Sequence, residues 1–139
     1  MKTLNLALLC LVVTLLTGSC SMVKDSKTAE PAVEKFHQQF NAGDFAQIYA
    51  DCGDQMKGVA TEKQLTDLLD AVHRKLGTYQ SSNEVSWHVD MGPLTNMVTL
   101  VYDTQFSEGK GTEQFVISVK GEVAKVEGYN INSTDLIVK

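Results

Sequence analysis

The hydrophobic period changes at Gly77, and this change limits the chain to one class of fold. Before Gly77, apolar residues recur every three or four positions, which is the period of an amphipathic helix. After Gly77, apolar and polar residues alternate, and β-branched and aromatic residues become frequent, as in half-buried strands. Helices followed by strands predict an α+β fold, in which helices cover the apolar face of an antiparallel sheet.

Three helices are predicted before Gly77. The first has Pro31 in its first turn and continues to Asn41, where Gly43 favours a stop and Asp44 an N-cap for the next helix. The second is expected from about Phe45 to Asp51. The core residues expected from these two helices are Val33, Phe36, Phe40, Phe45, Ile48 and Tyr49.

The third predicted helix has the clearest boundaries. Thr61 and Gln64 have the spacing of a capping box, and Gly77 marks the C-terminal end. Its apolar stripe consists of Leu65, Leu68, Leu69, Val72 and Leu76.

Four strands are predicted after Gly77, joined by short hairpins that make each neighbouring pair antiparallel. They are expected at about Tyr79 to Asp90, Thr95 to Phe106, around Phe115 to Val119, and Val123 to Asn132. In the first strand, alternation predicts that Trp87, with Val85 and Val89, faces the core, whereas His88 and Asp90 face solvent.

The N-terminal segment has the pattern of an export signal. Lys2 is followed by an uncharged apolar run from Leu4 to Leu16, then by small residues and Cys20. As a helix the run would cover about 20 Å, at roughly 1.5 Å per residue, whereas a bilayer core is about 30 Å thick. The run is therefore too short for a transmembrane anchor.

The sequence from Leu16 to Cys20, LTGSC, resembles the lipobox of bacterial lipoproteins, although Thr17 stands where that motif most often has leucine. The resemblance implies a signal peptide at 1–19, acylation of Cys20, and, because Ser21 replaces the aspartate that favours inner-membrane retention, a place on the periplasmic side of the outer membrane. The alternative is ordinary signal cleavage, which would release a soluble protein in which Cys20 and Cys52 could pair.

The remaining sequence predicts a lipidated cysteine with a flexible tether at 20–28 and a single α+β domain at 29–139. The tether is expected because this stretch is polar and shows no hydrophobic period. The chain carries a net charge of −5, which excludes the electrostatic attraction that nucleic acids need. The membrane is expected to be reached through the lipid, and no nucleic-acid partner is expected.

The order of elements is similar to the nuclear-transport-factor-two-like (cystatin-like) α+β fold. The points of similarity are the break from Asn41 to Phe45 between two helices and the strand from Gly128 to Asn132, within a likeness that spans Ala29 to Ile137. The resemblance implies a curved, cone-like sheet. Some members of that family are isomerases, dehydratases or hydrolases, and many others are non-catalytic binding or assembly modules, often dimeric through the sheet.

The pattern offers no convincing catalytic or metal site. Alternation turns His88, Asp90 and Asp103 away from the expected core, so no catalytic residue and no enzymatic activity are predicted. His37 and His73 lie on predicted helices without a second ligand at metal-binding spacing, so no metal or other cofactor is predicted.

Two functions follow as expectations. The first is a non-catalytic binding or assembly module that meets a protein partner or a second copy through the sheet, whose open face would carry Val101 and Val116. The alternative is a small-molecule pocket protein with weak activity at most. The expected apolar pocket consists of Trp87, Tyr102, Phe115 and Tyr129.

Overall fold

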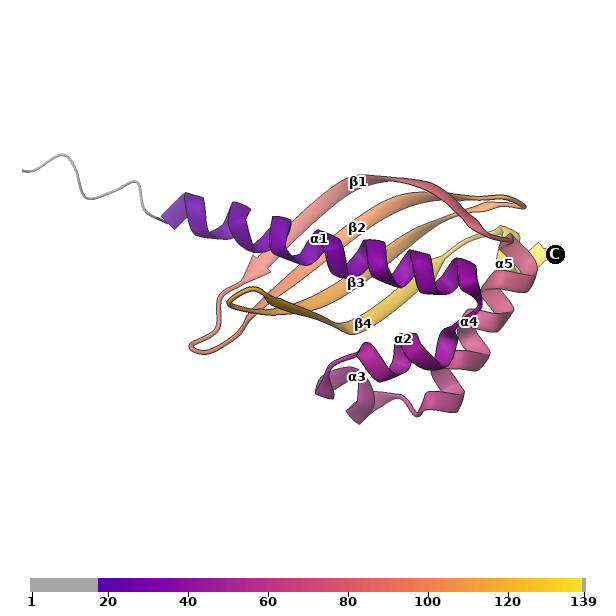
Figure 1. The fold of residues 1–139 in the computed structure, drawn as a ribbon. Helices are drawn as coiled ribbons and strands as arrows, with labels where there is room; N and C mark the ends of the chain where they lie inside the picture. The colour runs from indigo at the N-terminus through magenta and orange to yellow at the C-terminus, as the bar shows by residue number, and fades with distance from the viewer. Residues whose placement is uncertain (1–17, 139) are drawn as a thin grey trace, which may run out of the picture.

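The computed structural model describes residues 18–138, which form five helices and four strands (Figure 1). The helices are α1 (Gly18–Ala42), α2 (Phe45–Asp51), α3 (Asp54–Val59), α4 (Glu62–Leu76) and α5 (Asp135–Val138), and the strands are β1 (Tyr79–Asp90), β2 (Asn96–Phe106), β3 (Lys110–Lys120) and β4 (Val123–Asn132). The predicted α+β class is confirmed, with the helices first and the sheet second. No helix among these residues is both long enough and apolar enough to span a bilayer.

The sheet is an antiparallel meander in the order β1-β2-β3-β4, as the short hairpins predicted. The register places Trp87 opposite Leu100, Leu100 opposite Phe115, and Phe115 opposite Tyr129, so these residues share one face. The pairing is irregular between Glu84 and Ser86 of β1, and between Val116 and Ile117 where β3 pairs with β4. Such irregularities increase the twist of the strands.

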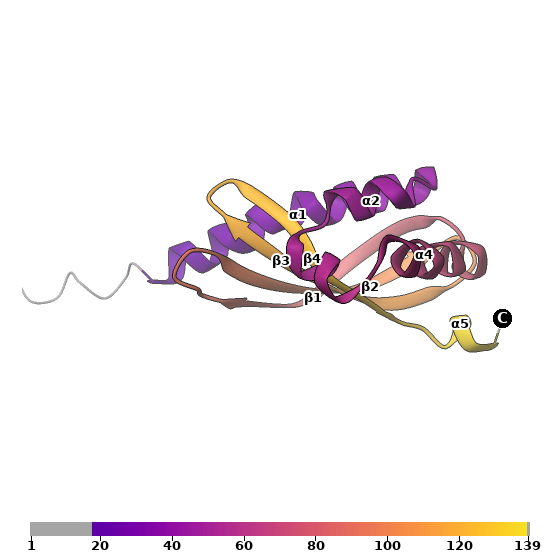
Figure 2. The same ribbon diagram turned by 90° about the horizontal axis from the view of Figure 1, so that it is seen from below.

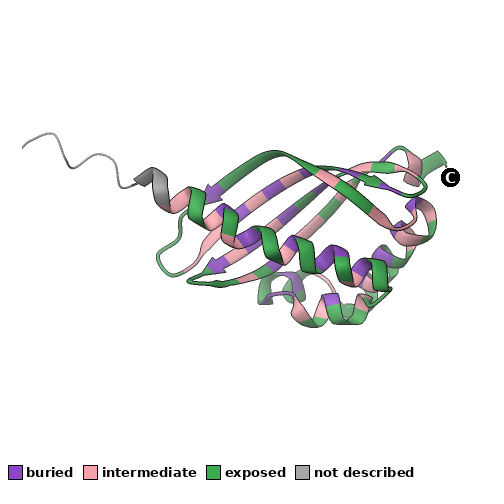
Figure 3. Ribbon diagram, turned by 45° about the horizontal axis from the view of Figure 1, so that its top comes forward, coloured by how far each residue is buried: buried purple, intermediate pink, exposed green. Residues whose placement is uncertain are grey.

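Helix α1 covers one face of the sheet. Helix α1 contacts all four strands, and Figure 2 shows α1 and α2 on the same side of them. Figure 3 shows buried and more exposed residues alternating along the strands that α1 crosses. The inward residues of the two central strands are Val98, Leu100, Tyr102, Thr104, Phe106, Glu113, Phe115, Ile117 and Val119.

Helix α1 begins earlier than predicted, and residues 20–28 are helical rather than a flexible tether. Ser26 and Ala29 are buried, and Met22 packs against the core. These residues continue the stripe of Val33 toward the N-terminus at helical spacing. The prediction failed because small or polar side chains occupy two positions of this stripe, so no hydrophobic period is visible. Pro31 lies inside the helix.

The break between α1 and α2 follows the prediction. Gly43 has a φ of 71°, a left-handed conformation that suits glycine after a helix end. Asp44 caps α2 by accepting a hydrogen bond from the Gln47 backbone N–H at 3.4 Å.

Helix α4 confirms the capping box at Thr61 and Gln64 and the end at Gly77, whose φ is 79°. Four residues of the predicted stripe are buried, but Leu68 is 40% exposed and lies outside the core. The position of Leu68 at the margin of the stripe explains the error, since a helix buries only part of its circumference.

Helix α3 was not predicted because its N-terminal partner comes from β4. Gly53, its N-cap, provides no side chain, and the Glu127 carboxylate instead accepts from the Gln55 backbone N–H at 2.8 Å. Gly53 N–H also donates to the Val126 carbonyl at 2.9 Å. A cap supplied by a distant strand leaves no local sequence signal.

Strand β1 is less buried than predicted. Val89 is buried, but Val85 and Trp87 are 50% and 42% exposed. Val85 lies at the register shift, and Trp87, which pairs with Leu100 and faces the covered side, lies on an edge strand with a neighbour on one side alone. His88 and Asp90 point to solvent as predicted, with side chains 70% and 72% exposed.

Adjacent leucines of α4 test the core assignment. Leu69→Ala is expected to lower the free energy of unfolding by about 2–5 kcal/mol, because Leu69 is fully buried and its loss leaves a cavity. Leu68→Ala, the matched control, is expected to cost about 0.5 kcal/mol or less. Urea unfolding followed by circular dichroism measures both values, and equal losses would contradict this packing of α4.

Candidate functional site

A buried carboxylate lies where α1 crosses the sheet. Glu113 on β3 is 1% exposed, and its oxygens meet side chains from three other elements. Thr104 on β2 donates its hydroxyl to Glu113 Oε2 at 2.7 Å, and Tyr129 on β4 donates to Oε1 at 2.8 Å. His37 Nε2 on α1 lies 2.8 Å from Oε2. We call these four residues the Glu113 cluster.

Strand alternation and helix spacing bring the Glu113 cluster together. Glu113 occupies an inward position of β3, two residues before Phe115, so its side chain must enter the core. His37 follows the core residue Phe36 on α1 and is itself 4% exposed. The prediction treated His37 as a helical histidine without a site, and it gave Glu113 no role. The sequence did contain a signal for Glu113. It lies two residues before Phe115, so strand alternation places both side chains on the same, inward face.

The ring of His37 is fixed by aromatic packing and a backbone clamp. It stacks on Tyr79 with 3.8 Å between ring centroids and 11° between ring planes. Asn41 holds Tyr79 in place, because its side chain accepts from the Tyr79 N–H at 2.7 Å and donates to the Tyr79 carbonyl at 3.0 Å. The end of α1 and the start of β1 therefore position the imidazole together.

Both oxygens of the buried Glu113 side chain have hydrogen-bond partners within the cluster. A buried charge is costly unless hydrogen bonds replace its water, and here both carboxylate oxygens have partners. Burial, together with the neighbouring Glu113 carboxylate, raises the pKa of Tyr129 well above its usual value. Tyr129 therefore stays a hydrogen-bond donor. This arrangement joins four elements and holds the acid in place.

A polar groove of about 430 Å³ opens beside His37. Its lining consists of Glu30, Val33, Glu34, His37, Tyr79, Ser82, Glu84 and Tyr102. Burial is the main cause of a raised pKa for Tyr102, and it also raises the pKa of Glu84, with a further contribution from Glu30. The groove can receive a polar or positively charged group, because Glu30, Glu34 and Glu84 line it together with His37.

The four aromatic residues predicted to form an apolar pocket are distributed between the core and the surface. Phe115 is fully buried, with ring centroids 6.2 Å from Tyr102 and 5.2 Å from Tyr129. Phe36 of α1 packs on the same rings, 5.0 Å from Phe115 and 4.8 Å from Tyr129. Trp87 remains 42% exposed on the edge strand. Three of the four rings therefore fill core space, and Tyr102 also lines the polar groove.

The other candidates lie apart from the Glu113 cluster. Asp103 accepts from Thr112 at 2.9 Å on the opposite face of the sheet. Cys52 is 2% exposed, and burial raises the pKa of its thiol to about 11. Within residues 18–138, no group of three or more His, Cys, Asp or Glu side chains is arranged to hold a metal ion.

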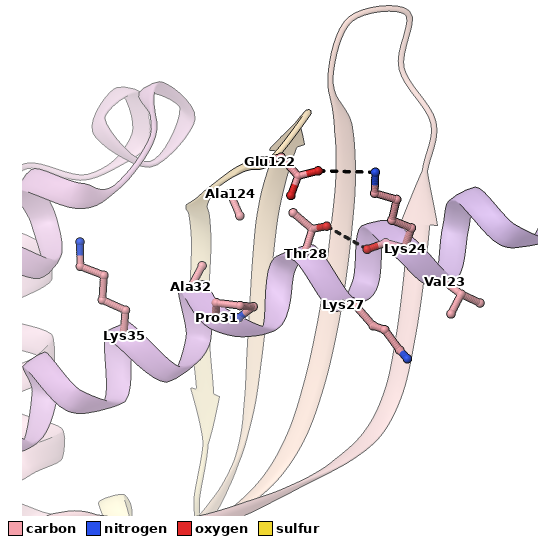
Figure 4. Close-up of a pocket in the computed structure, with 9 residues that line it drawn as sticks. All are labelled: Val23, Lys24, Lys27, Thr28, Pro31, Ala32, Lys35, Glu122 and Ala124. Carbon is pink, nitrogen blue, oxygen red and sulfur yellow. Dashed lines mark hydrogen bonds and ion pairs between the residues drawn. The ribbon is translucent and has the colours of Figure 1, made fainter.

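A second groove, of about 690 Å³, follows the middle of α1 from Val23 to Lys35. Figure 4 shows that its residues come from successive turns of α1 and from the start of β4. They are Val23, Lys24, Lys27, Thr28, Pro31, Ala32, Lys35, Glu122 and Ala124. The predicted lipidation residue, Cys20, lies on the same helix N-terminal to the groove, and its side chain is outside the described part of the structure.

Removing one hydrogen bond from Glu113 tests the structural role of the Glu113 cluster. Tyr129→Phe is expected to lower the free energy of unfolding by about 1.5–3 kcal/mol, because a charged acceptor loses a donor. The control Tyr49→Phe removes a 3.2 Å bond to the Ala60 carbonyl, a neutral acceptor, and is expected to cost about 0.5–1.5 kcal/mol. Chemical unfolding that gives the same loss for both variants would contradict the importance of the Glu113 cluster for stability.

The comparisons with known proteins identify a family but no activity. Residues 33–126 match the family described as "Protein of unknown function (DUF3887)", a range that begins within α1 and ends within β4. No curated protein and no solved structure matches the sequence. His37, Thr104 and Glu113 lie inside the matched range, and Tyr129 lies just beyond it. Because the match covers more than half of the chain, the protein belongs to the DUF3887 family.

Proposed function

We propose that the protein is a lipoprotein anchored through Cys20 to the periplasmic face of the outer membrane, and that its domain is a non-catalytic binding module. The anchor is supported by the apolar run from Leu4 to Leu16, the small residues that follow it, and Cys20 itself. Ser21 supports the outer rather than the inner membrane, by resemblance to other lipoproteins.

The observation that carries the binding role is the open face of the sheet. On β2, Met97, Thr99 and Val101 alternate with buried residues but are only partly buried themselves, and Val116 on β3 is similar. Helices α1 and α2 lie on the other side of the sheet (Figure 2), whereas Gln55 of α3 contacts Met97 at one end of this face. A mixed surface of β-branched and polar side chains suits a protein partner or a second copy of the chain.

The order of helices and the four-stranded meander also support a place among nuclear-transport-factor-two-like proteins. The turn from Asn41 to Phe45 carries the likeness, together with the strand from Gly128 to Asn132. In that group the sheet face commonly forms dimers, which agrees with the proposed binding surface.

The Glu113 cluster supports a structural rather than a catalytic use of its acid. A general base must reach a substrate proton, and must have a free lone pair in a suitable direction to accept it. Glu113 is 1% exposed and already accepts from Thr104 and Tyr129. Its hydrogen bonds stabilise the crossing of α1 over the sheet.

A second candidate function is small-molecule binding, which the groove beside His37 favours. Tyr79, Tyr102 and Glu84 line this groove with His37, so the ligand would be polar or cationic rather than apolar. Native mass spectrometry of protein purified from the envelope separates the two functions. A co-purified small molecule supports the groove, whereas a dimeric or heteromeric mass supports the sheet face.

Cysteine variants test the anchor. Wild-type protein is expected to carry acyl chains in its intact mass and to fractionate with outer membranes, because two or more chains give stable anchoring. Cys20→Ala is expected to lose both properties. The control Cys52→Ala is expected to keep both, since Cys52 is buried in the core and lies outside the predicted signal sequence. An unacylated wild-type protein in the aqueous fraction would refute the anchor.

Photo-cross-linking in intact cells tests the binding surface. A photoreactive phenylalanine at Val101 is expected to give one discrete product, whereas the same residue at Leu68, exposed on α4, is expected to give none. Adding Val116→Lys should abolish the product, because a lysine would place a charge in the contact. Equal labelling from both positions, or a product that survives Val116→Lys, would count against the sheet face.

A further inference from the structure

Exposed apolar side chains gather at the end of the molecule where α1 begins. They are Val23 at 45%, Met91 at 60%, Leu94 at 81% and Val123 at 58% exposure. Val23 lies on α1, and the others lie in or beside the β1–β2 and β3–β4 hairpins. Figure 1 shows both hairpins at this end, with α5 and the C-terminus at the opposite end. We call this region the hairpin end.

Polar contacts tie the hairpin end into one surface. Asn96, at the start of β2, donates to Asp25 Oδ2 on α1 at 2.7 Å and accepts from the Gly92 N–H at 3.2 Å. Lys24 pairs with Glu122 of the other hairpin at 3.5 Å (Figure 4). Both hairpins are therefore held against the first turns of α1.

The chain reaches its proposed lipid at the same end. Residues 1–17, which lie outside the described structure, join α1 at Gly18. Because α1 is helical from Gly18, Cys20 is separated from Asp25 by about 7.5 Å along the axis, at roughly 1.5 Å per residue. An acyl group on Cys20 would therefore hold the hairpins close to the lipid headgroups.

The charge of the hairpin end also permits contact with lipid. This region holds four cations and three acids, a net charge of +1, whereas the whole chain carries a net charge of −5; they are Lys24, Lys27, Lys120 and Lys125, and Asp25, Asp90 and Glu122. Repulsion from lipid phosphates is therefore weaker here than elsewhere on the protein, and exposed lysines can contact those phosphates.

We propose that the hairpin end docks on the surface of the lipid bilayer, with Leu94, Met91 and Val123 among the headgroups. This inference rests on the proposed anchor at Cys20 and adds a second, non-covalent contact with the same membrane. Transfer of exposed apolar side chains from water into the membrane interface lowers the free energy, and the lipid on Cys20 makes that transfer intramolecular.

Tryptophan probes in the full-length, acylated protein test the docking. In a Trp87→Phe background, Leu94→Trp and Val123→Trp report from the two hairpins. Ile137→Trp reports from the opposite end, where Ile137 is 82% exposed. The proteins are reconstituted into vesicles of phosphatidylethanolamine and phosphatidylglycerol that contain brominated acyl chains.

The two hairpin probes are expected to shift to shorter emission wavelengths and to lose most of their fluorescence, whereas the Ile137→Trp probe should match protein in unbrominated vesicles. Failure of either hairpin probe to respond, or equal quenching at Ile137→Trp, would overturn the proposal. Intact mass of the same preparation separates the two hypotheses. Missing acyl chains refute the anchor, and acylated protein with unquenched hairpin probes refutes only the docking.

Discussion

The buried Glu113 carboxylate fixes how the two layers of the fold meet. An acid that loses its water in the core must find hydrogen-bond partners, and these come from β2, β4 and α1. Apolar packing would allow small displacements of α1 along the sheet because it is not directional. Hydrogen bonds to one carboxylate require α1, β2 and β4 to take defined positions around β3. Glu113 therefore adds specificity to a contact that Phe36 and Phe115 stabilise by packing.

Local signals predicted much of the fold. Gly43 and Asp44 marked the break after α1, Thr61 and Gln64 marked the start of α4, and alternation marked the strands. Helix caps, turns and strand alternation depend on residues that are close together in the chain, so they can be recognised from the sequence. The predictions of His88 and Asp90 as solvent-facing were confirmed for the same reason, because strand parity assigns each side chain to a face.

The features that could not be predicted depend on distant parts of the chain. Helix α3 takes its cap from Glu127, and Trp87 is exposed on a strand that lies at the edge of the sheet. The early start of α1 was hidden because Ser26 is buried at a position where a hydrophobic residue was expected. Glu113 was missed for a similar reason. Strand alternation points its side chain inward, but the residues that make an inward acid tolerable lie on three other elements.

The structure separates a sealed interior from surfaces available for contact. Hydrogen bonds occupy the carboxylate of Glu113, and aromatic rings fill the space around Phe115, so the interior explains stability more directly than function. The open sheet face and the hairpin end have different compositions and lie in different directions. A lipid at Cys20 would hold the hairpin end at the membrane and, because α1 runs without a spacer into the domain, would leave the sheet face available to partners approaching along the membrane.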